Sequence, residues 1–194
     1  MAEHAVLIRH GETEWTASYR HTGRTDVPLN PHGEQRARLL APILAAMAEV
    51  DRATVFTSPL QRARRTCELA GLGERAIVLD DLVEWDYGEF EGTKTSELRE
   101  SDPDWSIWTA DITQGESLAA VATRADRVIE RLDGIDGCVV LFAHAHFLRI
   151  LGARWCGFPP DGGRRFTLEP ASISVLGYER ETKVVEGWNR SPHV

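Results

Sequence analysis

The sequence has no long hydrophobic run. Among its 194 residues, no apolar stretch approaches the roughly 18 residues that a membrane-spanning helix requires. The N-terminus also lacks a basic patch followed by an apolar segment and a small-residue cleavage site, which is the pattern of a secretory signal peptide. We therefore expect a cytoplasmic protein with no membrane partner.

Cysteine is scarce, and positive charge does not predominate. The three cysteines, Cys67, Cys138 and Cys156, are an odd number without the spacing of a metal site. They are typical of a reduced cytoplasmic chain in which each thiol is a small core residue. The formal net charge of −8 argues against nucleic acid or an anionic membrane as a partner. An anionic ligand would have to be attracted by a local cationic site.

What the sequence does contain is a regular alternation of short apolar runs and helical patterns. Its length fits a single domain over residues 1–194. Strands are predicted at 5–8, 53–58, 76–80, 137–146, 171–179 and 182–188. This order predicts an α/β fold, a three-layer α/β/α sandwich with a mostly parallel central sheet. The run at 137–146 does not alternate, which is typical of a central strand covered on both faces.

Helix start and stop signals lie between these strands. The Asn-Pro pair at 30–31 places an N-cap before a proline at the first helical position, and Pro42 is expected to kink or interrupt the helix that follows. The Ser-Pro pair at 58–59 repeats the start signal, and Gly71 supplies the stop. Apolar positions between 118 and 132 share one helical face.

Cationic and imidazole side chains follow three of the predicted strands. Arg9 and His10 follow the first strand, Arg62 follows the second, and His144 and His146 follow the central one. Ligands of open α/β sheets bind beyond the carboxyl ends of the strands, so we expect these side chains to meet at one edge of the sheet.

This combination suits a phosphate ester. Guanidinium groups bind phosphate oxygens with two parallel hydrogen bonds, and a neutral imidazole is a competent nucleophile near neutral pH. The helix after Ser58 would place Arg62 in its first turn, beside the positive end of the helix dipole. A second, protonated imidazole would stabilise the charge of the transition state. Such a set can replace a metal ion, because phosphoryl transfer depends mainly on positioning and electrostatics.

A leaving alkoxide also needs a proton. The segment VEWDYGEFEG at 83–92 is rich in carboxylates and aromatics, a setting that keeps a carboxyl group protonated near neutrality. Glu84 is the candidate donor, while Asp86, Glu89 and Glu91 compete for the role on the residues alone.

Five motifs occur in order along the chain: LIRHGETEW (7–15), TSPLQRARRT (57–66), EWDYGEFEG (84–92), GES (115–117) and LFAHAHF (141–147). Together they resemble the motifs of the histidine phosphatase superfamily, in its phosphoglycerate mutase-like branch. The resemblance spans nearly the whole chain. It implies an α/β sandwich and a phosphohistidine intermediate on His10. It also implies that Arg9, Arg62 and His144 complete the phosphate pocket and that Glu84 donates the proton.

The substrate side of the pocket is expected to hold Thr16, Thr22, Gly23, Tyr87, Ala145 and His146. Of these, Thr16, Thr22 and Gly23 are implied by the resemblance. His146 has an alternative role as a cap of the following helix. His144 and His146 have a spacing found in metal sites, but no third ligand is evident, so we expect neither a metal nor a cofactor.

The chain departs from the family pattern at two positions. Thr16 stands where the family usually has asparagine, and its hydroxyl can still donate one hydrogen bond. Ala145 stands where the family usually has glycine, so its methyl group lies where the backbone would approach phosphate.

Arg20, His21 and Arg24 either bind a second phosphate or carboxylate or belong to a polar surface loop.

The predicted activity is that of a metal-independent phosphomonoesterase acting on a small phosphorylated metabolite. The resemblance narrows this to broad acid phosphatases and sugar-bisphosphatase-like enzymes. The chain is shorter than the cofactor-dependent mutases, so water should reach the phosphohistidine and favour hydrolysis. The alternatives are a phosphoglycerate mutase, a silent module that binds phosphorylated ligands, and a metal-dependent hydrolase. A homodimer is the default expectation for the assembly.

Overall fold

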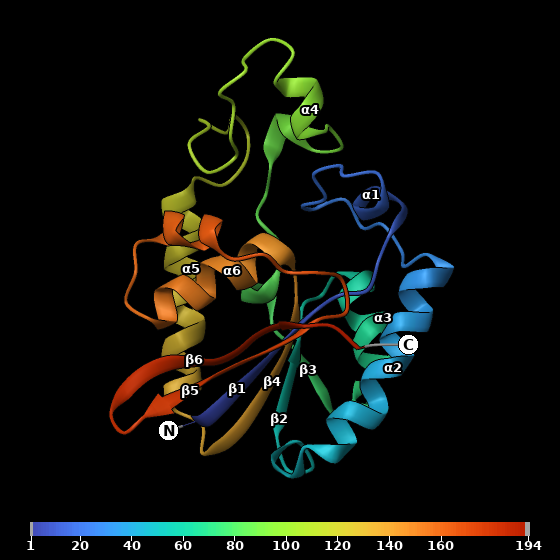
Figure 1. The fold of residues 1–194 in the computed structure, drawn as a ribbon, viewed down its shortest axis with the longest axis vertical. Coiled ribbons are helices and arrows are strands. Elements are labelled where there is room, and N and C mark those ends of the chain that lie inside the picture. Colours follow the sequence, from blue (N-terminus) through green and yellow to red (C-terminus); the bar gives the residue numbers. More distant parts are fainter. Residues whose placement is uncertain (1, 193–194) are drawn as a thin grey trace.

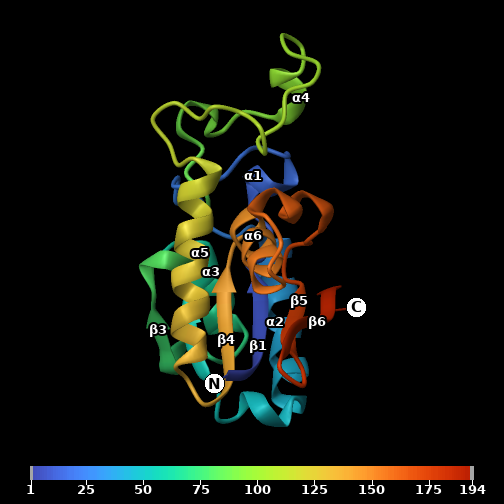
Figure 2. The same ribbon diagram turned by 90° about the vertical axis from the view of Figure 1, so that its left-hand side faces the viewer.

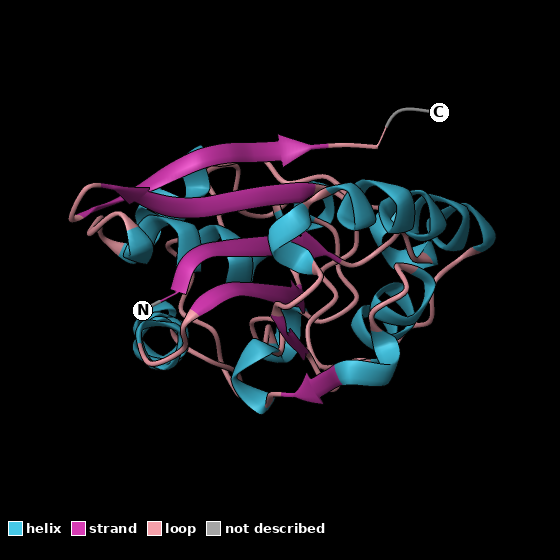
Figure 3. Ribbon diagram, turned by 90° about the horizontal axis from the view of Figure 1, so that it is seen from below, coloured by secondary structure: helices cyan, strands magenta, loops and turns pink. Residues whose placement is uncertain are grey.

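The computed structural model describes residues 2–192 and contains one six-stranded sheet with the strand order β3-β2-β4-β1-β5-β6. The strands are β1 Ala2–Arg9, β2 Thr54–Thr57, β3 Ala76–Val78, β4 Gly137–Ala143, β5 Ile173–Glu179 and β6 Thr182–Arg190. The first four in spatial order are parallel, while β5 and β6 run antiparallel to their neighbours. Figure 3 shows the strands side by side, with β6 at the outer edge. The sheet is therefore mixed and mostly parallel, as predicted.

Helices cover both faces of this sheet. They are α2 Pro31–Ala46, α3 Gln61–Leu69, α5 Leu118–Asp133 and α6 Ala145–Trp155, with two short helices, α1 Glu14–Ala17 and α4 Thr95–Leu98. Single 3-10 turns lie at 48–50, 73–75, 80–82 and 88–90, and a longer one at 160–165. In Figure 1, α2 and α3 lie on one side of the sheet and α5 and α6 on the other. This arrangement confirms the three-layer α/β fold.

The central strands are buried on both faces, because a separate hydrophobic cluster packs against each face of the sheet. Along β4, Val139 and Leu141 pack into the cluster beneath α5 and α6, while Val140 and Phe142 pack into the cluster beneath α2 and α3. Burial of each such side chain contributes about 1.5–3 kcal/mol relative to exposure. The absence of polar–apolar alternation in this run thus follows from its position between β2 and β1.

Several element boundaries differ from the sequence-based expectations. The prediction of Ser58 as a helix cap is wrong, because α3 begins at Gln61 and its N-cap is Leu60, without a side-chain cap. α2 continues through Pro42 to Ala46, so the proline does not interrupt it. β4 ends at Ala143, and the predicted end of that strand forms the start of α6.

The register of the parallel strands places their carboxyl ends at one level. Arg9 pairs with Ala143 across β1 and β4, and Thr57 pairs with Phe142 across β2 and β4. The segment that contains α4 rises above this edge, with α1 beside it (Figures 1 and 2). The residues that follow β1, β2 and β4 therefore lie at one edge of the sheet, on the side where α1 and the segment containing α4 are found.

Candidate active site

A cleft of about 230 Å³ opens above the carboxyl ends of β1 and β4. Its lining contains Arg9, His10, Thr16, Tyr19, Arg20, His21, Thr22, Glu84, Tyr87, Thr95, Ala145 and His146. Eight of these residues are among the eleven site residues expected from the sequence. The other three, Arg62, His144 and Gly23, lie outside the lining and contact one another or the residues beside it.

His10 is almost completely buried, and its ring makes one hydrogen bond. Its Nδ1 lies 2.6 Å from the carbonyl oxygen of Gly11, so Nδ1 carries the proton and donates it. The other ring nitrogen, Nε2, therefore keeps its lone pair. Burial lowers the pKa of His10 well below 6.5, and the nearby charges of Arg62 and Arg9 lower it further. The ring is a neutral imidazole with a free lone pair on the nitrogen opposite the fixed proton.

The turn after His10 requires glycine. A Cβ at Gly11 would lie 2.6 Å from the carbonyl oxygen of Gly33, at the start of α2. The backbone N–H of Gly11 donates to Thr66 Oγ1 of α3 at 2.9 Å. The loop is thus held between two helices, which fixes the carbonyl that orients His10.

Arg62 and His144 form a buried pair beside His10. Arg62 Nε donates to His144 Nδ1 at 3.2 Å, and His144 Nε2 lies 2.8 Å from Ser58 Oγ. The rings of His144 and His10 have centroids 5.1 Å apart. Since Nδ1 accepts a hydrogen bond, His144 is neutral, and burial followed by Arg62 lowers its pKa well below 6.5. This differs from the protonated second imidazole expected from the sequence, because the guanidinium already supplies the positive charge.

The remainder of the Arg62 guanidinium binds the backbone of the loop at 22–25. Its terminal nitrogens donate to the carbonyl oxygens of Thr22, Gly23 and Thr25 at 3.2, 2.8 and 2.9 Å. The N–H groups of the same loop donate to the Glu91 carboxylate, with Gly23 N at 2.7 Å. A charged side chain therefore holds the loop on each of its two sides.

Arg9 is the cationic side chain that lines the cleft directly. One terminal nitrogen donates to the carbonyl oxygen of Leu168, and Nε is buried without a partner among residues 2–192. Burial lowers the pKa of Arg9, while the negative charges of Glu84 and Glu169 oppose that effect. Donors of this kind at the cleft suit an anionic group.

Glu84 is the carboxylate of the 83–92 segment that reaches the cleft. Its Oε1 accepts hydrogen bonds from the backbone N–H groups of Trp85 and Phe147, both at 2.9 Å. Its Oε2 accepts only one, from His146 N at 3.0 Å, so that oxygen retains lone pairs for a proton. The carboxylate thus lies on the first turn of α6, which brings it close to the end of β4.

The competing carboxylates have other partners. Asp86 Oδ1 accepts from the backbone N–H of Gly88 at 3.0 Å, Glu91 holds the 22–25 loop, and Glu89 is exposed. None of the three lines the cleft. The structure therefore distinguishes Glu84 from residues that the sequence left as alternatives.

The outer part of the cleft is built from aromatic and imidazole rings. Tyr87 Oη lies 2.6 Å from His146 Nδ1, and burial raises the pKa of Tyr87 and lowers that of His146. His21 packs against Tyr87 and Trp105, and burial lowers its pKa to about 4. His146 does not act as a helix cap, because His144 occupies that position and His146 lies in the first turn of α6.

The expected substrate-side residues are only partly free to bind a ligand. The Thr16 hydroxyl donates to the carbonyl oxygen of Thr13 at 3.0 Å, because it belongs to the cap of α1. Thr22 Oγ1 likewise donates to the carbonyl oxygen of Arg20 at 3.0 Å. Ala145 presents its methyl group at the first position of α6.

Sequence reasoning missed Tyr19 and Thr95 in the lining. Tyr19 is 85% exposed and has a positive φ of 59°, at the end of α1. Thr95 Oγ1 lies 3.2 Å from His21 Nε2. Thr95 comes from α4, far along the sequence, so no local pattern identifies it. The positive φ of Tyr19 leaves no signature in a residue type that usually avoids that conformation.

Residues 2–192 hold no group of three or more His, Cys, Asp or Glu side chains arranged to bind a metal ion. Within the same range, no helix combines the length and the apolar character needed to cross a bilayer. Cys67 and Cys138 are buried and Cys156 is partly buried, and all three are free thiols.

The fold and the cleft define an α/β enzyme whose site joins a neutral histidine to arginines and a glutamate. A model of the histidine phosphatase superfamily (branch 1) matches residues 5–191 of the chain. The chain belongs to this superfamily, and it is a phosphatase.

The relatives agree in sequence and in structure. An acid phosphatase of Mycobacterium tuberculosis is 42% identical over 176 residues, which cover 90% of this chain and 86% of the relative. A sedoheptulose 1,7-bisphosphatase of Saccharomyces cerevisiae is 35% identical over 181 residues, which cover 78% of this chain and 67% of the relative. The solved structure of an open reading frame product from Mycobacterium tuberculosis has a TM-score of 0.91 at 36% identity and matches 100% of both chains.

Proposed function

We propose that this phosphatase hydrolyses small phosphorylated metabolites, sugar phosphates among them, through a phosphohistidine on His10 and without a metal ion. The observation that carries the proposal is the hydrogen bond from His10 Nδ1 to the carbonyl oxygen of Gly11, which leaves Nε2 as a neutral nucleophile. Arg9 and Glu84 line the same cleft as His10. A cationic group and a carboxyl group therefore line the cleft in which a phosphoryl group on His10 would lie.

In the first step, the lone pair of His10 Nε2 forms a bond to phosphorus while the bond from phosphorus to the ester oxygen breaks. Protonated Glu84 gives its proton to the leaving oxygen. Arg9 and the buried Arg62–His144 pair oppose the charge on the phosphoryl oxygens, and the Arg62–His144 pair acts from beside His10.

In the second step, ionised Glu84 takes a proton from water, and the water oxygen bonds to phosphorus. The N–P bond breaks, which returns the lone pair to His10 and releases phosphate, and Glu84 is protonated again. Tyr19, which lines the cleft, is 85% exposed, so the cleft is open to solvent at that residue, and an open cleft favours hydrolysis over transfer to a second hydroxyl.

Two relatives support the choice of substrate class. The similar proteins include an acid phosphatase and a bisphosphatase of a seven-carbon sugar. A cleft of about 230 Å³ suits a metabolite rather than a macromolecule. The polar outer lining, with Arg20 and Thr95, suits hydroxyl and anionic groups on the leaving group.

The test is phosphate release from p-nitrophenyl phosphate and a panel of sugar phosphates in the presence of EDTA. We expect turnover by the wild type and loss of at least about 10³-fold in the His10→Ala variant. After rapid acid-free quenching, a phosphoryl group should be found on His10. Wild-type activity no higher than that of His10→Ala would refute the proposal. Slow release with stimulation by a bisphosphorylated primer would instead identify a mutase.

A further inference from the structure

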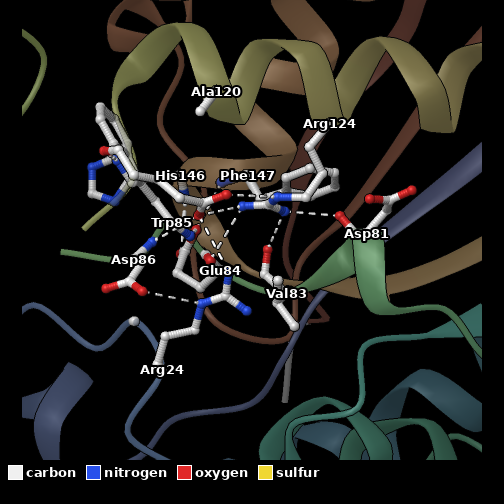
Figure 4. Close-up of polar contacts among 12 residues, drawn as sticks. Arg24, Asp81, Val83, Glu84, Trp85, Asp86, Ala120, Arg124, His146 and Phe147 are labelled. Carbon is white, nitrogen blue, oxygen red and sulfur yellow. Dashed lines mark hydrogen bonds and ion pairs between the residues drawn. The ribbon is translucent and has the colours of Figure 1, made fainter. Parts of the chain in front are cut away.

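Arg124 is a buried cation outside the cleft, on the face of α5 that meets the Glu84 segment. It is 5% exposed, and its guanidinium lies over the ring of Phe147 at 4.7 Å from the centroid. Its side chain makes hydrogen bonds from all three nitrogens (Figure 4). A buried guanidinium with this many directed bonds fixes the position of whatever accepts them.

The backbone acceptors of Arg124 are the carbonyl oxygens of Glu84 and of the residues just before it. Nη1 donates to the carbonyl oxygens of Asp81 and Val83 at 2.8 and 2.6 Å, and Nη2 donates to that of Glu84 at 3.3 Å. Asp81 belongs to the single 3-10 turn at 80–82, Val83 and Glu84 follow it, and none of the three carbonyl oxygens accepts a hydrogen bond from a backbone N–H among residues 2–192. Arg124 therefore supplies partners to backbone groups that would otherwise be buried without them.

Glu116, of the GES motif, connects Arg124 to the residues that follow Glu84. Its Oε1 and Oε2 accept from Arg124 Nε and Nη2 at 3.1 and 2.9 Å, and Oε2 also accepts from the backbone N–H of Asp86 at 3.0 Å. The carbonyl oxygen of Glu116 accepts from Trp85 Nε1 at 2.8 Å. Arg124 thus binds the backbone of residues 81–84, and Glu116 binds the two residues that follow Glu84.

Phe147 links this pair to the carboxylate itself. Its ring lies under the Arg124 guanidinium, and its backbone N–H donates to Glu84 Oε1 at 2.9 Å. The same guanidinium therefore acts on the backbone of Glu84 and on the residue that orients the Glu84 carboxylate.

We propose that Arg124, together with Glu116, is the positioning residue for the proton donor of the reaction. The inference rests on the proposed role of Glu84, and neither Arg124 nor Glu116 lines the cleft. A buried ion pair by itself is weak evidence for a contribution to stability, since well-packed apolar residues often serve as well. We assign Arg124 and Glu116 to the positioning of Glu84 because their hydrogen bonds to the backbone and to Trp85 all go to residues 81–86.

Positioning of a proton donor has a kinetic signature that a structural role lacks. An alkyl oxygen leaves poorly without a proton, whereas p-nitrophenolate is a good leaving group and depends little on one. Displacing Glu84 should therefore slow the hydrolysis of an alkyl phosphate far more than that of p-nitrophenyl phosphate. Well-placed acid–base groups contribute about 10²–10⁴-fold in rate.

The experiment compares Arg124→Lys, Arg124→Met and Glu116→Gln with wild type on the sugar phosphate that wild type hydrolyses fastest and on p-nitrophenyl phosphate. We expect kcat on the sugar phosphate to fall at least about 10-fold and kcat on p-nitrophenyl phosphate to fall less than about threefold. Arg124→Lys should retain more activity than Arg124→Met. The matched control is Arg127→Met on the same helix, where Arg127 is exposed and pairs with the Asp81 carboxylate.

Combination with Glu84→Gln provides the second readout. The Glu84→Gln, Arg124→Lys double variant should be no slower on the sugar phosphate than Glu84→Gln alone, because the two changes remove the same contribution. Equal losses on both substrates, or additive losses in the double variant, would overturn the inference. If Arg124→Met fails to fold, Arg124→Lys and Glu116→Gln still decide the outcome. A wild type no more active than His10→Ala would instead mark failure of the proposed function.

Discussion

Arg62 and His144, 82 residues apart in the sequence, lie in direct contact with 3.2 Å between Nε and Nδ1, and both side chains are completely buried. The contact fixes the tautomer of His144 and the plane of the guanidinium. It also leaves the terminal nitrogens of Arg62 to hold the 22–25 loop. One side chain therefore organises both the imidazole next to His10 and the loop that borders the cleft.

The first prediction concerns this contact. Lysine at position 62 keeps the charge but cannot donate from a planar fork to His144 and to the loop carbonyls at once. We expect Arg62→Lys to lower kcat on p-nitrophenyl phosphate by about 10²-fold, the scale seen when one preorganised donor is lost. Steady-state kinetics measures the effect. Arg64→Lys, at an exposed position on the same helix, is the control and should keep wild-type kcat.

The second prediction separates Glu84 from Glu91. Glu84→Gln removes the transferable proton, so kcat on sugar phosphates should fall by about 10²-fold or more. Glu91→Gln instead weakens the grip on the N–H groups of Gly23 and Thr25, so it should raise KM more than it lowers kcat. Measuring kcat and KM for both variants checks this. The opposite pattern, with kcat lost mainly in Glu91→Gln, would reassign the proton donor.

The third prediction is a pH dependence of stability. In the unfolded chain a histidine titrates near about pH 6.5, whereas burial holds the pKa of folded His21 at about 4. Between these values the unfolded state binds more protons, so the free energy of unfolding falls as the pH falls. The contribution of neutral His21 to the free energy of unfolding is therefore complete above about pH 6.5. It decreases toward pH 4, by up to about 1.4 kcal/mol for each pH unit.

His21→Phe tests that dependence, since the ring contacts with Tyr87 and Trp105 remain possible. Relative to its own value at pH 8, the variant should lose less unfolding free energy than wild type between pH 6.5 and pH 5. Urea denaturation at each pH measures both curves. Parallel curves for the two proteins would show that His21 is not held neutral by the fold.

The fourth prediction concerns specificity. Arg20 lines the outer part of the cleft, with one terminal nitrogen bound to the carbonyl oxygen of Gly92 at 2.7 Å. If this arginine binds a second anionic group, Arg20→Met should raise KM for a sugar bisphosphate by about 10-fold and leave p-nitrophenyl phosphate unaffected. Arg38→Met, at an exposed position on α2, is the control. If Arg20→Met changes KM equally for both substrates, or for neither, then Arg20 belongs to a polar surface loop and does not bind a second anionic group.

The fold and the inner part of the site were predictable because they follow from local patterns. Short buried runs define β1 and β4, and the parallel register then brings Arg9 and His144 to the same edge. Roles that depend on contacts across the chain were not predictable. Ser58 resembled a helix cap but approaches His144 instead, and nothing local in the GES motif indicates the contact between Glu116 and Arg124.

The 22–25 loop is held by both Arg62 and Glu91, and this limits which positions around the cleft can accept substitutions. Its carbonyl groups bind Arg62 and its N–H groups bind Glu91, and a Cβ at Gly23 would lie 2.5 Å from the carbonyl oxygen of Trp85. Mutations there would disturb Arg62, and through it His144, as well as the border of the cleft. Efforts to redirect this enzyme to new esters should therefore randomise the rim around Tyr19 and Thr95, where side chains can be exchanged while the reactive centre stays intact.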